Sequence, residues 1–137
     1  MIVTEKKKVV RSPEDVAGIM RSILAAEGEV DCMKEHFWTV GLNNKNVIQY
    51  IELVSLGTLT SAVLGPREVF RLAVHKAIAN ILICHNHPSG DPEPSKEDRD
   101  ITQRLVAAGQ ILGIKVLDHI IVGDPAYCSF RDRGFIQ

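Results

Sequence analysis

Two histidines, His85 and His87, stand two positions apart directly after the apolar run 81–84. Side chains alternate between faces in an extended chain, so both imidazoles point the same way as Ile81 and Ile83. Neutral imidazole is the commonest side-chain ligand of zinc, and the end of a central strand is a common ligand site in α/β folds. The pair therefore indicates a metal site, although a single histidine at such a position is more often structural.

A catalytic zinc keeps three protein ligands and leaves its fourth position to water, so a third ligand must come from elsewhere. A helix expected from Ser95 to about Leu112 can supply it, because Glu97 and Asp98 both lie on the flanks of its apolar face. Periodicity does not choose between these two carboxylates. Ser95 with Asp98 three residues later is also typical of a helix N-cap with an acid in the first turn, which needs no metal.

The residues His85-Asn86-His87, seven residues, Ser95, two residues and Asp98 together resemble the H-x-H-x7-S-x2-D motif of JAMM (JAB/MPN) metalloproteases. The resemblance covers nearly the whole chain and is to the RadC-type branch of that family. Its motifs are Ser-Pro-Glu-Asp-Val at 12–16, Gly-Thr-Leu at 57–59, Arg-Glu-Val-Phe at 67–70, His-Asn-His-Pro-Ser-Gly at 85–90 and Ser-Phe-Arg at 129–131.

The resemblance implies one zinc held by His85, His87 and Asp98, and so favours Asp98 over Glu97. It also implies that Ser95 assists at the bound water or at the oxyanion. The general base of the family is a glutamate at the start of a strand, and Glu35, just before the apolar pair Phe37-Trp38, occupies that position. Weaker candidates for this base are Glu27, Glu29, Glu52 and Glu68.

The expected function is that of a zinc metallopeptidase or isopeptidase that hydrolyses an amide bond in a protein or peptide. Zinc lowers the pKa of its bound water toward about 7, and a glutamate can take the proton as the water attacks.

An alternative is a metal-containing binding module associated with DNA repair, because RadC-type proteins often carry that label. Only about a dozen residues precede the domain, so the helix-hairpin-helix-like region common in that branch is not expected here. A zinc nucleoside deaminase is set aside, because neither H-x-E nor P-C-x-x-C is present.

The remaining histidines, His36, His75 and His119, are expected to be hydrogen-bonded structural residues, with His119 as a reserve metal ligand. Cys84 alternates to the face opposite His85 and is expected to pack as a small buried hydrophobe. The cysteines are odd in number and form no C-x-x-C pair, which indicates a reducing cytoplasm and no disulfide framework. They are Cys32, Cys84 and Cys128.

The elements that position these residues follow from periodicity and caps. Helices are predicted at 13–26, from Pro66 to near Asn80, and from Ser95 to about Leu112. Strands are predicted at 36–42, 47–56, 81–84, 116–122 and 128–130, with a β-rich stretch at 58–63. The first two strands should pair antiparallel across the turn at 43–46. The predicted fold is α/β, layered as α+β, with a mixed sheet flanked by about three helices; the resemblance implies a JAB/MPN (cytidine-deaminase-like) fold.

The bulk composition indicates one globular domain of ordinary make-up. The chain has 137 residues, 45% hydrophobic and 24% charged, and we expect a lead segment at 1–11 followed by the domain at 12–137. No basic-then-apolar signal order opens the chain, so a cytoplasmic location without a membrane partner is expected. A net charge of −1 does not favour nucleic acid as a partner. The sequence leaves the oligomeric state and the substrate open.

Overall fold

A computed structural model describes residues 2–3, 8–57, 59–60 and 63–137 of the chain. The helices are α1 (Pro13–Ala25), α2 (Pro66–His75) and α3 (Lys96–Leu112), with a short 3-10 helix η1 (Asp31–Met33). The strands are β1 (Ile2–Val3), β2 (His36–Leu42), β3 (Ile48–Leu56), β4 (Asn80–Asn86), β5 (Lys115–Val122) and β6 (Tyr127–Ser129). Of the predicted β-rich stretch 58–63, residues 58, 61 and 62 lie outside the described residues, as do residues 1 and 4–7 of the predicted lead segment.

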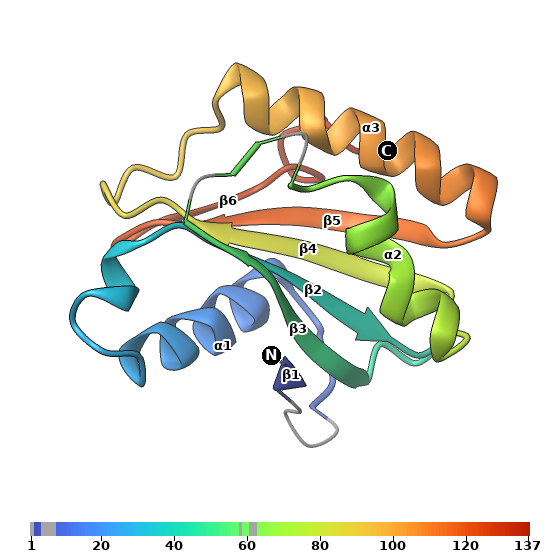
Figure 1. Cartoon of the computed structure of the whole chain (residues 1–137), viewed down its shortest axis with the longest axis horizontal. Helices are drawn as coiled ribbons and strands as arrows, with labels where there is room; N and C mark the ends of the chain where they lie inside the picture. The colour runs from blue at the N-terminus through green and yellow to red at the C-terminus, as the bar shows by residue number, and fades with distance from the viewer. Residues whose placement is uncertain (1, 4–7, 58, 61–62) are drawn as a thin grey trace.

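The strands form one mixed sheet in the order β1-β3-β2-β4-β5-β6. β4 pairs parallel with β5, and the other neighbours pair antiparallel, including β2 with β3 as predicted. Helix α1 covers one face of the sheet, and α2 and α3 lie on the other (Figure 1). The predicted α+β layered architecture, a mixed sheet with three flanking helices, is confirmed.

Strand β4 lies in the interior of the sheet and divides its side chains between two cores. Ile81 and Ile83 pack in the core beneath α2 and α3, whereas Leu82 and Cys84 pack in the core beneath α1. This alternation confirms the predicted strand buried on both faces. The observed strand is longer than the predicted one and includes His85. The side chain of His85 therefore points to the same face of the sheet as Ile81 and Ile83, the face covered by α3.

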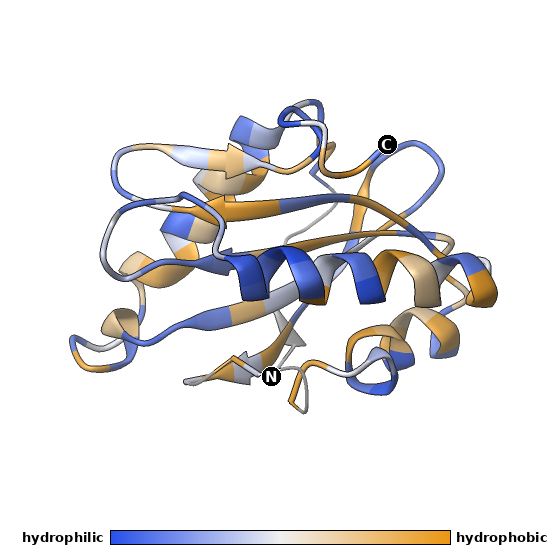
Figure 2. Ribbon diagram, turned by 90° about the horizontal axis from the view of Figure 1, so that it is seen from above, coloured by the Kyte–Doolittle hydropathy of each residue, from blue (hydrophilic) through white to orange (hydrophobic). Residues whose placement is uncertain are grey.

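Helix α3 begins and ends with strong local signals. Ser95 and Asp98 form a capping box at its first turn, and Gly113 closes it with a left-handed φ of 73°. The helix is hydrophilic along its first turns and becomes hydrophobic toward its C-terminal end (Figure 2). Asp98, the third expected metal ligand, lies in the first turn at the N-terminus of this helix.

Helix α2 ends earlier than predicted, at His75 instead of near Asn80. The amide of Lys76 closes the last turn, and Ala77 takes a φ of 56°, which a right-handed helix does not continue. Val74, in the last turn of the observed helix, is 58% exposed. The predicted helix was therefore too long at its C-terminal end.

No helix within the described residues has both the length and the apolar character needed to cross a membrane.

Candidate metal centre

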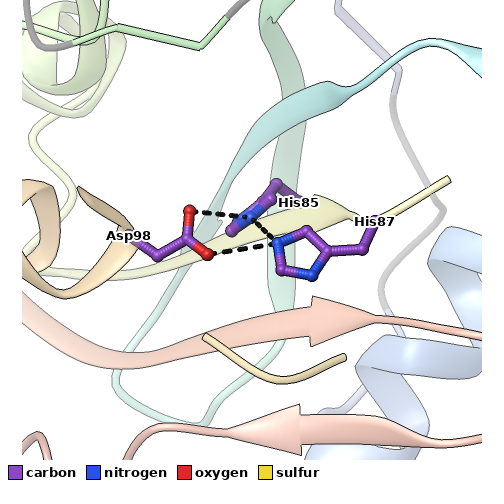
Figure 3. Close-up of side chains that lie close together, drawn as sticks. All are labelled: His85, His87 and Asp98. Atoms are coloured by element: carbon purple, nitrogen blue, oxygen red, sulfur yellow. Dashed lines mark hydrogen bonds and ion pairs between the residues drawn. The ribbon is translucent and has the colours of Figure 1, made fainter. Parts of the chain in front are cut away.

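Three side chains from β4, the segment after it and α3 point toward one another (Figure 3). Nε2 of His85 lies 3.0 Å from Nε2 of His87, and the Asp98 carboxylate lies 3.3 Å from the first nitrogen and 3.1 Å from the second. Among the described residues, these form the group of histidine, cysteine and acidic side chains that could hold a metal ion. The structure thus brings together the three residues expected to be ligands.

The spacing of these atoms fits a small tetrahedral ion. With metal–ligand distances of about 2.0–2.1 Å, the edges of a tetrahedral zinc site are about 3.3 Å long. The three separations of 3.0–3.3 Å lie close to that length. Two imidazoles and one carboxylate are a donor set typical of a catalytic zinc with an open fourth position.

The site lies at the border between core and solvent. The side chain of His85 is 2% exposed, whereas those of His87 and Asp98 are 15% and 14% exposed. A molecule that enters from solvent therefore meets His87 and Asp98 first, whereas His85 lies at the buried side of the site.

Asp98 is oriented by the first turn of α3. The backbone amide of Ser95 donates to Oδ2 of Asp98 over 2.8 Å, and the amide of Asp98 donates to Oγ of Ser95 over 3.0 Å. Burial alone would raise the pKa of Asp98, but hydrogen bonds from His85 and His87 hold it far below its ordinary value. Capping and metal coordination are compatible here, because the capped carboxylate still faces both imidazoles. Glu97, the other open candidate, is exposed.

His87 is oriented by the loop that follows β4. Its Nδ1 lies 2.8 Å from the carbonyl oxygen of Asp91, and only a protonated nitrogen makes that hydrogen bond. Nε2 of the neutral ring is then free of a proton and faces Asp98. When the ring is protonated, Nε2 donates to Asp98, and this hydrogen bond raises the pKa of His87 above its ordinary value, against the opposing effect of burial. The charge of Glu35 adds to the rise.

Behind His85 lies His119, the reserve ligand of the sequence interpretation. Nε2 of His119 is 2.7 Å from Nδ1 of His85, and its Nδ1 is 2.6 Å from Oγ1 of Thr102. Burial and the neighbouring His85 hold the pKa of His119 well below its ordinary value. His119 is therefore a buried, hydrogen-bonded residue outside the group of three, which confirms its structural interpretation.

The other two histidines differ from each other. His36 is fully buried, with Nδ1 2.8 Å from the carbonyl oxygen of Lys34, as expected of a structural histidine. His75 is exposed at the end of α2, so the same expectation was wrong there. Cys84 is buried on the opposite face of β4, as expected, and burial raises its pKa.

Glu35 lies immediately before β2, beside the end of β4. In the antiparallel pairing of these strands Phe37 faces His85, so the register carries Glu35 toward His87. The Asn86 side chain holds the backbone on both sides of Glu35: Oδ1 accepts from the amide of His36 over 2.6 Å, and Nδ2 donates to the carbonyl of Lys34 over 3.1 Å.

The sequence interpretation did not predict the clamp formed by Asn86. The alternation of side chains along the strand was the available signal, because a buried amide on the face opposite the two histidines needs hydrogen-bond partners. Three of the four weaker base candidates contact other side chains. Glu52 pairs with Arg71, Glu68 pairs with Arg67, and Glu27 lies 3.7 Å from His36, while Glu29 is exposed.

Ser95 lies beside the group, at the N-cap of α3. Its Oγ accepts the hydrogen bond from the amide of Asp98, so the cap uses a lone pair of the hydroxyl and not its hydrogen. The side chain is exposed. Its capping role is confirmed, and the cap leaves the hydroxyl hydrogen of Ser95 unused.

The sequence of the chain was compared with those of known proteins and protein families. Residues 10–135 match the RadC-like JAB domain. A UPF0758 protein of Desulforamulus reducens is 46% identical over 132 residues, covering 96% of this chain and 56% of that protein. UPF0758 proteins of Caldanaerobacter subterraneus and Methanosarcina mazei are 48% and 44% identical, covering 92% and 98% of this chain and 52% and 57% of theirs. The chain thus spans about half the length of these curated relatives. With the match extending over almost all of its residues, the chain belongs to the RadC-like JAB domain family.

Proposed function

We propose that this domain is a zinc-dependent peptidase or isopeptidase that hydrolyses an amide bond in a protein or peptide. The observation that carries the proposal is the convergence of His85, His87 and Asp98 at separations of 3.0–3.3 Å, with Glu35 held beside them. A JAB domain with this donor set has the parts that metal-assisted hydrolysis requires.

His85, His87 and Asp98 are the residues that would hold the metal. When bound, zinc lowers the pKa of a coordinated water toward about 7 and polarises a carbonyl oxygen. The hydrogen bond from His87 to the Asp91 carbonyl keeps that ring from turning, and the capping box does the same for Asp98. Partial exposure of these two side chains leaves room for the amide on the solvent side.

Glu35 would act as the general base and then as the general acid. It takes a proton from the attacking water as the water oxygen bonds to the carbonyl carbon. The same proton then passes to the amide nitrogen as the carbon–nitrogen bond breaks, so a carboxylic acid and an amine leave. Asn86 fixes the backbone around Glu35 and thereby fixes the base relative to His87.

Ser95 would stabilise the oxyanion. Its hydroxyl hydrogen is not used by the helix cap, so it can be donated to the carbonyl oxygen as negative charge develops there. Removal of a single donor of this kind lowers kcat by about a hundredfold to a thousandfold in other hydrolases.

The proposal is tested by combining metal analysis with cleavage assays on Glu35→Gln. The zinc-reconstituted protein is incubated with two pools of fluorogenic peptides, one with α-amide bonds and one with lysine ε-amide bonds. We expect Glu35→Gln to retain the zinc of the wild type and to lose hydrolysis by about a hundredfold or more. Glu29→Gln, which changes an exposed glutamate nearby, serves as the matched control and should cleave as the wild type does.

Two results would contradict the proposal: cleavage by Glu35→Gln at the wild-type rate, or no cleavage of either pool by the zinc-loaded wild type. In the second case, binding of a DNA duplex with a steep salt dependence would favour the binding-module alternative. The net charge of −1 gives that alternative no support.

A further inference from the structure

A chain of hydrogen bonds through three buried side chains links His85 to the backbone of Asp98. Nδ1 of His85 lies 2.7 Å from Nε2 of His119, and Nδ1 of His119 lies 2.6 Å from Oγ1 of Thr102. The Thr102 hydroxyl in turn donates to the carbonyl oxygen of Asp98 over 2.7 Å, one turn earlier in α3. His85 and His119 are each 1% exposed and Thr102 is 2% exposed, so water does not compete for these bonds.

We propose that His119 and Thr102 are positioning residues that fix the proton of His85 on Nδ1, and so present an unprotonated Nε2 of His85 to the metal. The inference rests on the metal site of the proposed function but not on its hydrolytic step. It extends the site to two residues, one on β5 and one on α3, that touch no metal themselves.

The direction of the chain follows from counting hydrogens. A carbonyl oxygen only accepts, so the single hydroxyl hydrogen of Thr102 is committed to Asp98. Oγ1 of Thr102 must then accept from His119, which places the proton of the neutral His119 ring on Nδ1. Nε2 of His119 is left with a lone pair, and the hydrogen in its contact with His85 can come only from Nδ1 of His85.

The reverse direction is unfavourable for two reasons. A proton on Nε2 of His119 would be donated to His85, and a neutral His85 would then carry its own proton on Nε2, the nitrogen that faces His87 and Asp98, where it would block coordination of a metal. The Thr102 hydrogen would turn to His119 and leave two oxygen atoms, those of Thr102 and Asp98, facing each other at 2.7 Å without a hydrogen. Two oxygen atoms at this separation repel each other when no hydrogen lies between them.

The packing around His119 holds its ring in place. Phe130 stacks on the ring with a centroid separation of 4.4 Å, and Phe37 contacts it edge-on at 6.0 Å. The backbone of His119 is fixed as well, because its amide donates to Asp118 and its carbonyl accepts from the amide of Phe130. These contacts fix the orientation of the imidazole, with Nδ1 facing Thr102 and Nε2 facing His85.

The first test reads the tautomers directly in the wild type. Nitrogen-15 NMR of the histidine rings distinguishes a protonated ring nitrogen from an unprotonated one, with and without zinc. We expect the proton of His119 on Nδ1 in both states, and that of His85 on Nδ1 in the zinc-loaded protein. A proton on Nε2 of His119 in either state would overturn the inference. A wild type that binds no zinc would instead defeat the proposed function, and the tautomer of His119 could still be read.

The second test measures zinc affinity in variants of Thr102. Thr102→Val keeps the shape of the side chain but removes the hydroxyl, so we expect the zinc Kd to rise by about tenfold or more, whereas Thr102→Ser should restore it. Thr39→Val is the matched control, because Thr39 on β2 is equally buried but belongs neither to the metal-binding group nor to the chain of hydrogen bonds. A zinc Kd of Thr102→Val equal to that of Thr39→Val, at similar stability of the metal-free proteins, would overturn the inference.

Discussion

The two ring nitrogens of His87 have different roles: one orients the ring and the other faces the metal site. Nδ1 donates to the carbonyl of Asp91, and Nε2 lies 3.1 Å from the carboxylate of Asp98. His85 follows the same arrangement, with His119 in the place of the carbonyl. Metal-binding histidines are ordinarily held in this way by a second hydrogen bond, which fixes the ring before the metal arrives.

At this scale we predict that zinc affinity rises with pH. The pKa of His87 lies above its ordinary value because of Asp98, so protons compete with zinc below that raised pKa. The apparent Kd should fall by about tenfold per pH unit there and level off above it. The His87–Asp98 pair has the opposite trend in the metal-free protein: its stabilising effect is present below the unfolded pKa of histidine and is lost as pH rises through the raised pKa.

Competition with a chelator from about pH 5 to about pH 9, corrected for protonation of the chelator, measures this dependence. Asp98→Asn weakens the hydrogen bond and removes the charge that raise the pKa of His87, so the titration of His87 in the metal-free variant should move to lower pH. A pH-independent Kd of the wild type would contradict a site built from two imidazoles.

Among the elements, the first turn of α3 has two roles, because its capping box both starts the helix and aims Asp98. Such caps can be predicted from sequence, since Ser95 and Asp98 have the required types and spacing. The sequence pattern of a helix does not, however, indicate how a strand elsewhere in the chain is oriented relative to it. Only the tertiary structure shows that this turn faces the end of β4.

We predict that Ser95→Ala changes both stability and metal binding. Loss of the cap should lower the free energy of unfolding by about 1 kcal/mol and weaken zinc binding, because Asp98 is less firmly oriented. Ser12→Ala removes the equivalent cap of α1 and is the matched control, with a similar loss of stability but an unchanged zinc Kd. Chemical denaturation and zinc titration check both, and equal zinc affinity of the two variants would contradict the orienting role of Ser95.

The limits of prediction follow the same division between local and tertiary information. The strand at 36–42, the start of α3 and the alternation along β4 could be predicted, because each depends on neighbouring residues. The bond from Asn86 to the amide of His36 joins residues 50 positions apart, and the contact of Thr102 with His119 joins a helix to a strand. Such contacts leave no periodic pattern in the sequence.

The choice of Asp98 over Glu97 was also beyond periodicity and came from the family motif. In the folded chain the difference is plain, since Asp98 faces both histidines whereas Glu97 is exposed. The early end of α2 was missed because the left-handed conformation of Ala77 has no signal in a residue type that favours helices.

For the whole molecule, the sheet separates two hydrophobic cores, and the metal centre lies at the end of the interior strand between β2 and β5. His85 lies on β4 and Asp98 on α3, whereas His87 lies in the loop after β4, where its amide donates to the carbonyl of Val122 on β5. The matched part covers 56% and 52% of two relatives, so the protein or peptide on which a full-length member acts belongs to the proposal.

Metal content of the reconstituted protein is the most direct test of the central claim. The protein is stripped with a chelator, supplied with zinc, freed of excess zinc and analysed by mass spectrometry for zinc per chain. We predict one equivalent in the wild type and in Glu97→Ala, and none in Asp98→Ala, although all three remain folded. A wild type without zinc, or zinc that persists in Asp98→Ala but is lost in Glu97→Ala, would contradict the assigned site.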